Sequence, residues 1–102
     1  MILLIGFFTS GYSQTVDAQT PKLIHFYPNP AINFINFEKE ESTDKECSLQ
    51  VYNFIGKKVV DIPNMTAKVN IPLNDFFRGI YIYQLRNKVG KIIESGKFQV
   101  VK

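Results

Sequence analysis

Apolar and polar residues alternate along most of the chain, in short runs bounded by glycine, proline and asparagine. Such period-two runs predict β-strands, because successive side chains of a strand point to opposite faces of a sheet. Helical periodicity is confined to PLNDFFRG, where we expect at most one helical turn near 74–78. The pattern predicts an all-β domain, a small two-layer antiparallel β-sandwich (Ig-like) of about seven short strands. We expect these strands near residues 24–27, 34–38, 48–54, 57–62, 69–72, 80–86 and 91–101.

Glycines lie where this pattern requires tight turns. Gly56 in NFIGKK and Gly90 in NKVGK sit where a short hairpin needs a positive φ, which glycine adopts without steric cost. Gly79 follows Leu73 and Phe76 and can end the single turn. We therefore expect Gly56 and Gly79 to have backbone roles that other residues cannot fill.

The stretch LIHFYPNP, residues 23–30, begins like a strand and then places a proline on each side of Asn29. Pro28 and Pro30 cannot donate to a ladder, and a residue before proline is held extended. We therefore expect YPNP to be a stiff lead-in that separates whatever precedes the domain from a sandwich that starts near Ile35.

The first residues, MILLIGFF, form an apolar run too short to span a bilayer, followed by the small and polar stretch TSGYSQ. This is typical of an export signal with cleavage after Ser13 or Ala18, although no positive residues precede the run. A hydrophobic first strand is the alternative. We divide the chain into a signal peptide at 1–18, N-terminally truncated if the gene is clipped, a linker at 19–22 and a domain at 23–102, with no transmembrane segment.

Composition and charge indicate a packed domain with a solvated surface. The 102 residues are 45% hydrophobic and 14% aromatic, enough for one core. Acidic residues gather between Glu38 and Glu46, in a predicted loop, whereas from Cys47 onwards nine Lys or Arg accompany three acidic residues. A basic face with aromatic residues could bind nucleic acid. The lysines, however, fall at turns and alternate strand positions, as on the solvated side of a sheet, so we expect no nucleic-acid partner.

The residues that carry common catalytic or metal chemistry are scarce. His25 is the only histidine and Cys47 the only cysteine, so neither a two-histidine nor a cysteine-rich metal site can form within one chain. We expect both side chains to be structural, although Cys47 could in principle act as a nucleophile. No nucleotide-binding, hydrolase or calcium-loop motif occurs. We expect no enzyme activity, no cofactor and no metal.

Four segments occur in a distinctive order: FYPNP, LQVYNFIGKKV, IPLNDFFRGIYIYQL and a basic last strand that ends in Lys102. Together they resemble the type A C-terminal sorting domain of the type IX secretion system (Por secretion system) of Bacteroidetes, over residues 23–102. The residues that match its motifs, or that lie on its basic last strand, are Pro28, Asn29, Pro30, Gly56, Lys57, Leu73, Phe76, Gly79, Tyr81, Lys97 and Lys102.

The resemblance implies an address label that does no chemistry itself. Proteins of this family enter the periplasm through a signal peptide, and the outer-membrane translocon recognises their C-terminal domain. A sortase-like cysteine protease commonly removes the domain and attaches the cargo to the cell surface; other products reach the extracellular space. Recognition would use exposed strand edges and hairpin turns. Only TVDAQTPKL separates the signal peptide from the motif, so we expect no cargo domain here, and we expect the address to lie in residues 79–102.

The competing hypothesis is a free-standing secreted β-sandwich that binds carbohydrate or acts as an adhesin. In that case Tyr81 and Tyr83 would form an exposed platform on which sugars stack. A third interpretation is purely structural, in which Gly79 turns the chain and Tyr81 fills the core.

Overall fold

The computed structural model describes residues 22–41, 43 and 46–102 of the chain. The expected signal peptide at 1–18 lies outside these described residues. The described part contains no helix, and the segment at 74–78 is a turn in which Phe76 N–H donates to Leu73 O at 3.0 Å. The all-β prediction is confirmed. Its strands are β1 (Ile24–Tyr27), β2 (Phe34–Lys39), β3 (Ser48–Tyr52), β4 (Lys58–Ile62), β5 (Lys68–Pro72), β6 (Gly79–Arg86) and β7 (Ile92–Val100).

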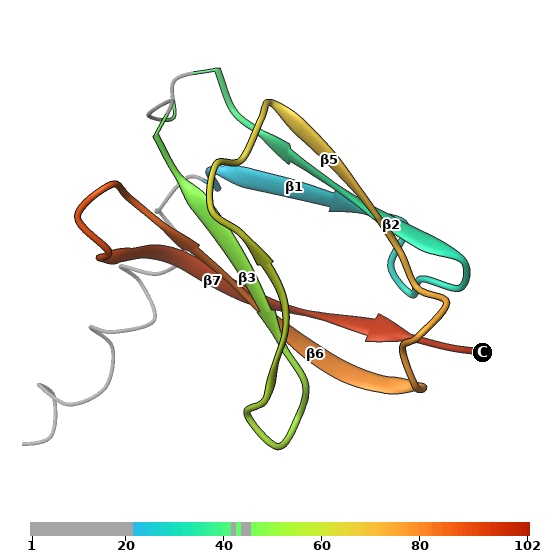
Figure 1. Ribbon diagram of the computed structural model, residues 1–102. Coiled ribbons are helices and arrows are strands. Elements are labelled where there is room, and N and C mark those ends of the chain that lie inside the picture. Colours follow the sequence, from blue (N-terminus) through green and yellow to red (C-terminus); the bar gives the residue numbers. More distant parts are fainter. Residues whose placement is uncertain (1–21, 42, 44–45) are drawn as a thin grey trace, which may run out of the picture.

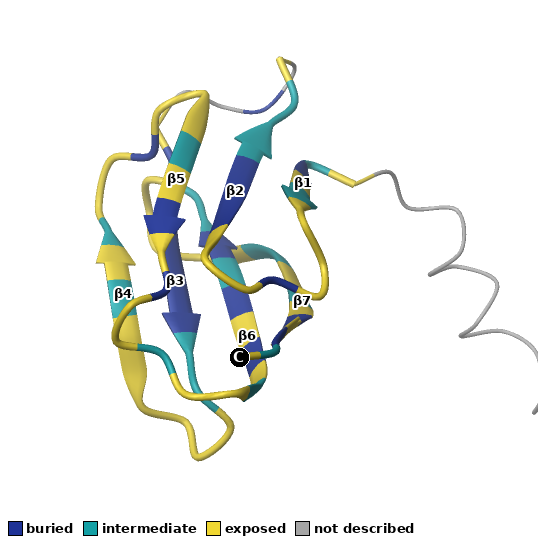
Figure 2. Ribbon diagram, turned by 90° about the vertical axis from the view of Figure 1, so that its right-hand side faces the viewer, coloured by how far each residue is buried: buried dark blue, intermediate teal, exposed yellow. Residues whose placement is uncertain are grey.

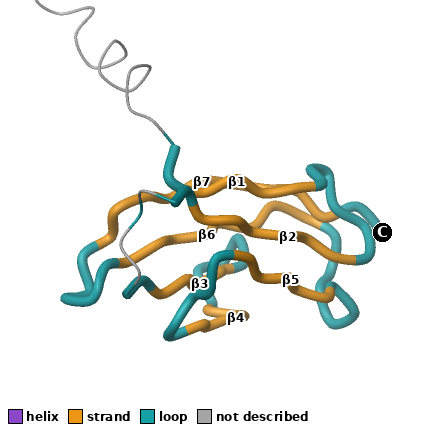
Figure 3. Tube along the Cα trace, turned by 90° about the horizontal axis from the view of Figure 1, so that it is seen from above, coloured by secondary structure: helices purple, strands orange, loops and turns teal. Residues whose placement is uncertain are grey.

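The strands form two antiparallel sheets that stack face to face (Figure 1). One has three strands in the order β1-β2-β5, and the other has four in the order β4-β3-β6-β7. Two views at right angles agree that β1 lies with β7, β2 with β6 and β5 with β3, whereas β4 extends beyond β5 (Figures 2 and 3). The small antiparallel sandwich is thus confirmed, with one strand of the larger sheet left without a strand opposite.

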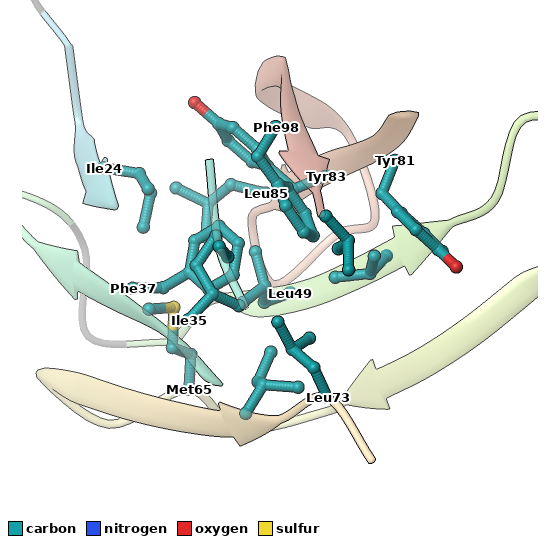
Figure 4. Close-up of a cluster of buried hydrophobic side chains, with 14 of the residues drawn as sticks. Ile24, Ile35, Phe37, Leu49, Met65, Leu73, Tyr81, Tyr83, Leu85 and Phe98 are labelled. Carbon is teal, nitrogen blue, oxygen red and sulfur yellow. The ribbon is translucent and has the colours of Figure 1, made fainter. Parts of the chain in front are cut away.

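The core lies between the sheets and follows the alternation read from the sequence. Phe37 is fully buried at its centre, with its ring 5.4 Å from that of Tyr83 and 5.7 Å from that of Phe98 (Figure 4). Burying a large apolar side chain contributes about 1.5–3 kcal/mol, so these positions carry much of the fold's stability. The buried apolar residues are Ile24, Ala31, Ile35, Phe37, Cys47, Leu49, Val51, Met65, Ile71, Leu73, Tyr81, Tyr83, Leu85, Phe98 and Val100.

The expected start of the sandwich near Ile35 is wrong. β1 pairs with β2 from Ile24 opposite Lys39 to Tyr27 opposite Asn36, and Ile24 is part of the core. YPNP therefore lies inside the domain, where it connects β1 to β2, and both X–Pro bonds are cis. An edge strand tolerates prolines at its end because no ladder bond is lost there.

The two hairpins of the four-stranded sheet have the same turn. Asn53 Oδ1 accepts the N–H groups of Ile55 and Lys57 at 3.1 and 2.9 Å. Asn87 Oδ1 likewise accepts those of the residues two and four positions on, at 3.1 and 3.0 Å. Gly56 and Gly90 have φ of 89° and 91°. The positive φ expected at both glycines is confirmed, and it belongs to a repeated N-x-x-G-K turn.

Candidate functional site

Three segments far apart in the sequence meet at one end of the sandwich. They are the strap, defined as Pro28–Ala31, the β5–β6 loop, residues 73–78, and the end of β7 with the two residues that follow it. In Figure 1 the last residue lies beside this loop. Most of the motif residues expected from the sequence lie in these segments, so the fold assembles them into one structural unit.

The strap binds the outer edge of β7 through backbone and side-chain hydrogen bonds. Asn29 Oδ1 accepts the N–H of Gln99 at 3.0 Å, and Ala31 N–H donates to Gln99 O at 2.8 Å. Val101 N–H then donates to Ala31 O at 2.8 Å. These groups point away from β6 and would otherwise form a free sheet edge. The segment expected to be a lead-in is therefore the partner of the last strand.

Lys102 closes the β5–β6 loop. Its ammonium donates to the backbone carbonyls of Leu73 at 2.6 Å, Phe76 at 3.0 Å and Asn74 at 3.3 Å. An ammonium has three donors, and here each finds a carbonyl of the same loop. We call this arrangement the Lys102 clasp, because it ties the end of the chain to the loop.

The β5–β6 loop also packs on the core. Leu73 is fully buried, and the ring of Phe76 lies 4.9 Å from that of Tyr81. Tyr81 O–H donates to the carbonyl of Phe77 at 2.8 Å. Gly79, with a φ of 147°, provides the backbone conformation from which β6 starts. This positive φ agrees with the backbone role expected of Gly79. The L-x-x-F-x-x-G-x-Y segment forms one loop folded against β6.

The exposed platform of Tyr81 and Tyr83 that the competing carbohydrate-binding hypothesis requires is not present. Their side chains are 5% and 0% exposed, because the alternation along β6 places both on its inner face (Figure 4). Tyr83 O–H donates to Glu94 Oε2 at 2.8 Å. Burial, and after it the bond to Glu94, raises the pKa of Tyr83 well above its ordinary value of 10. The aromatic surface assumed for a carbohydrate-binding module is absent from β6.

The β3–β4 turn faces the β5–β6 loop across a groove. Gly56 lies in this turn and Lys57 at its end, so both are near the other motif residues. Lys97 is different: it is exposed in the middle of β7, opposite Ile82, and makes no contact with the clasp. The groove is lined by Asn53, Lys57, Lys58, Val59, Asp75, Phe76, Phe77 and Tyr81.

Sequence reasoning missed several residues of this site. Ala31, Gln99 and Val101 form the strap bonds through backbone atoms, for which a side-chain pattern carries no signal. The paired asparagines could have been found, because LQVYNFIGKK and YQLRNKVGKI share Gln, Asn, Gly and Lys at equal spacing. Phe77 is exposed beside the clasp, and its place next to Phe76 in PLNDFFRG carries no signal of that exposure.

The side chains that could carry metal chemistry are dispersed over the described residues. They contain no group of three or more His, Cys, Asp or Glu side chains that could hold a metal ion. Cys47 is buried and His25 contacts Glu40 on the surface. Nor do the described residues include a helix with the length and apolar character needed to cross a membrane.

Comparisons with known proteins give a matching family and a protein of similar fold. The family described as "Secretion system C-terminal sorting domain" matches residues 25–100. PorZ, an essential bacterial surface component of the type-IX secretion system of Porphyromonas gingivalis, has a similar fold, with a TM-score of 0.64 and 17% identity. The similarity covers 91% of this chain but 13% of that one. No curated protein matches. With most of its length matched, the chain belongs to the family of secretion system C-terminal sorting domains.

Proposed function

We propose that the folded domain is read by the outer-membrane translocon of the type IX secretion system. As a sorting domain it directs export across the outer membrane, to the cell surface or beyond it. In our proposal the domain itself performs no chemistry and binds no cofactor. A protein joined to its N-terminal side would be the cargo.

The observation that carries this proposal is the joining of both ends of the domain. The opening motif accepts hydrogen bonds from the last strand through Asn29 and Ala31, and Lys102 ties the last residue to the β5–β6 loop. An unfolded chain cannot present these motifs together. A translocon that recognises this surface therefore exports the cargo only when the sorting domain has folded.

The same structure limits where a sortase-like cysteine protease could act. β1 is paired with β2 from Ile24 onwards, and Leu23 N–H donates to Glu94 Oε1 at 2.6 Å. Proteolytic cleavage concentrates in exposed loop tips and termini rather than in hydrogen-bonded strands. We propose that cleavage, if it occurs, falls on the N-terminal side of Leu23, so that the domain is released intact.

A fusion experiment tests the function. Residues 22–102 are joined to the C-terminus of a periplasmic fluorescent reporter that has its own signal peptide, in a host with this secretion system. We expect the reporter on the cell surface or in the medium, and in the periplasm when the translocon gene is deleted. Retention of a folded fusion in the periplasm of the intact host would contradict the proposal.

A further inference from the structure

The two long sides of the sandwich differ in how they are closed. On the β1–β7 side, the strap and the bond from Leu23 to Glu94 join the sheets. On the other side, no strand of the three-stranded sheet lies over β4 among the described residues (Figure 3). Lys58 and Val59 of β4, the strand on this unclosed side, line the groove between the β3–β4 turn and the β5–β6 loop.

Large apolar side chains surround this groove. Phe77 is 85% exposed on one wall and Phe54 is 78% exposed in the facing turn. Tyr81 is buried and Phe76 is half-buried, and their rings form the apolar floor of the groove. Exposed apolar clusters of this kind mark interaction surfaces. The equivalent β6–β7 turn instead borders a hollow lined mainly by polar residues, so the two turns differ in the apolar side chains beside them.

The side chains that line the groove carry more positive than negative charge. Lys57 and Lys58 both line it. Lys58 is paired with Asp61 at 3.3 Å, whereas Lys57 forms no ion pair with any described residue. Arg78 lines the adjoining hollow, which shares Phe77 with the groove. Asp75 is the one carboxylate among the lining side chains. A segment that carries carboxylates beside an apolar side chain would complement this positive charge, and a basic segment would be repelled.

The sheet edges on this side are poor templates for strand addition. Leu73 N–H donates to the carbonyl of Asn33, the residue before β2, so the neighbouring Pro72 faces the free edge of β5 and offers no donor there. β4 is irregular, with a register shift opposite Val51 and Tyr52. Pro72 on β5 and the irregularity of β4 both make these edges less able to pair with an added strand. Side chains in the groove, rather than a backbone ladder, are therefore the available means of recognition.

A concave groove also favours a protein segment over a bilayer. A flat membrane would meet the tips of Phe54 and Phe77 and leave the floor at Phe76 and Tyr81 unfilled. A side chain on an extended segment reaches that floor and is flanked by the lysines that line the groove.

From these observations we propose that the groove receives an extended, acidic segment of a protein of the secretion machinery, with one apolar side chain packed on Phe76, Phe77 and Tyr81. The inference rests on the proposed function and names the surface and the chemistry by which the translocon or its associated proteins read the domain.

The repeated turn provides matched controls for a delivery experiment. In the reporter fusion, Phe77→Ser and Lys57→Glu alter the groove, whereas Val89→Ser and Lys91→Glu make similar changes on exposed side chains at the equivalent turn. We expect each groove variant to lower surface delivery by about tenfold, as for loss of a central anchor, while the controls stay within about twofold of the parent. Melting temperatures of the purified domains verify that all four are folded.

The identity of the occupant is tested by photo-cross-linking in the same host. The photoreactive residue p-benzoylphenylalanine is placed at position 77, and at position 89 as control. We expect a position-specific adduct with an outer-membrane protein, mapped to a peptide with carboxylates beside an apolar residue. Adducts only with lipid or with a second copy of this chain would overturn the proposal. So would Phe77-dependent sedimentation of the domain with vesicles of phosphatidylglycerol and phosphatidylcholine in equal amounts.

The outcomes separate the two proposals. If the parent fusion is not delivered, the proposed function fails and this inference fails with it. If the parent is delivered and the folded groove variants are delivered equally well, the function stands and the groove is not the surface that is read.

Discussion

At the residue scale, the five-residue turn N-x-x-G-K shows how little sequence is needed to determine a local conformation. In both hairpins the asparagine side chain accepts two backbone N–H groups, and the glycine has the positive φ that closes the turn. Both effects act within five residues. They recur unchanged at opposite ends of the sheet, although the flanking side chains differ.

We expect Gly56→Val and Gly79→Val each to destabilise the domain by about 1–3 kcal/mol, because a β-branched residue is strained at their φ of 89° and 147°. Added Cβ atoms would meet no neighbour, so the cost is in the backbone. Urea unfolding measures it, with Lys57→Val as the control beside Gly56. A variant as stable as the parent would remove the argument for a forced turn at its site.

Tyr83 makes the free energy of unfolding decrease at alkaline pH. Its folded-state pKa is raised above 10 by burial and the bond to Glu94, so above pH 10 the unfolded chain loses this proton while the folded domain keeps it. Stability from this group is therefore complete below pH 10 and falls as the pH rises. We expect Tyr83→Phe to reduce the loss of unfolding free energy between pH 9 and 11 by about 1 kcal/mol. Identical pH profiles of variant and parent would contradict this.

At the scale of elements, the strap and the clasp organise the end of the sandwich. β7 is an edge strand, yet the backbone groups near its end are bonded to Asn29 and Ala31. The β5–β6 loop likewise has its carbonyls bonded to Lys102. Each element is completed by a segment distant in the sequence, so each can be weakened by a single substitution.

We expect Asn29→Ala to cost about 1 kcal/mol, since it leaves the N–H of Gln99 without its acceptor. Hydrogen exchange gives a local measure: the amides of Gln99 and Val101 should exchange faster than in the parent. Asn64→Ala changes an exposed asparagine on another loop and should leave both rates unchanged. Unaltered exchange at Gln99 in the Asn29 variant would mean that the strap bond contributes nothing.

Lys102 is not a free surface charge, whereas Lys97 is exposed on β7. Lys102→Met removes an ammonium from three carbonyls, so we expect a loss of about 1–3 kcal/mol and faster exchange in the β5–β6 loop. Lys97→Glu should change stability by less than about 0.5 kcal/mol. Thermal unfolding distinguishes the two. Charge reversal at Lys97 is therefore the cleaner test of whether the last strand's charge is read in delivery.

At the scale of the whole molecule, a three-stranded sheet packs on a four-stranded one. The sheets are joined along the β1–β7 side, whereas β4 on the other side has no strand opposite among the described residues. The β1–β7 side depends on the end of β7, which contributes Phe98 and Val100 to the core and the bonding partners of the strap. The opening motif and the core thus both depend on the end of β7. A change there affects both.

Deletion of residues 98–102 should therefore unfold the domain. Losing Phe98 alone costs about 3–5 kcal/mol, and small domains have only about 5–15 kcal/mol in total. Near-ultraviolet circular dichroism and a cooperative melt would both be lost, together with surface delivery of a fused reporter. A truncated domain that still melts cooperatively would show that the last strand is dispensable for folding and confine its role to recognition.

The sequence by itself determined the all-β class, the seven strands to within two residues and the turns at Gly56 and Gly90. These follow from alternation and backbone sterics, which act over a few residues. Only the tertiary structure decided that YPNP joins two strands and binds the end of β7, that Tyr81 and Tyr83 face inward, and that Lys102 closes the β5–β6 loop. Asn29 and Gln99 are 70 residues apart, and such contacts depend on which faces and edges the packed core brings together.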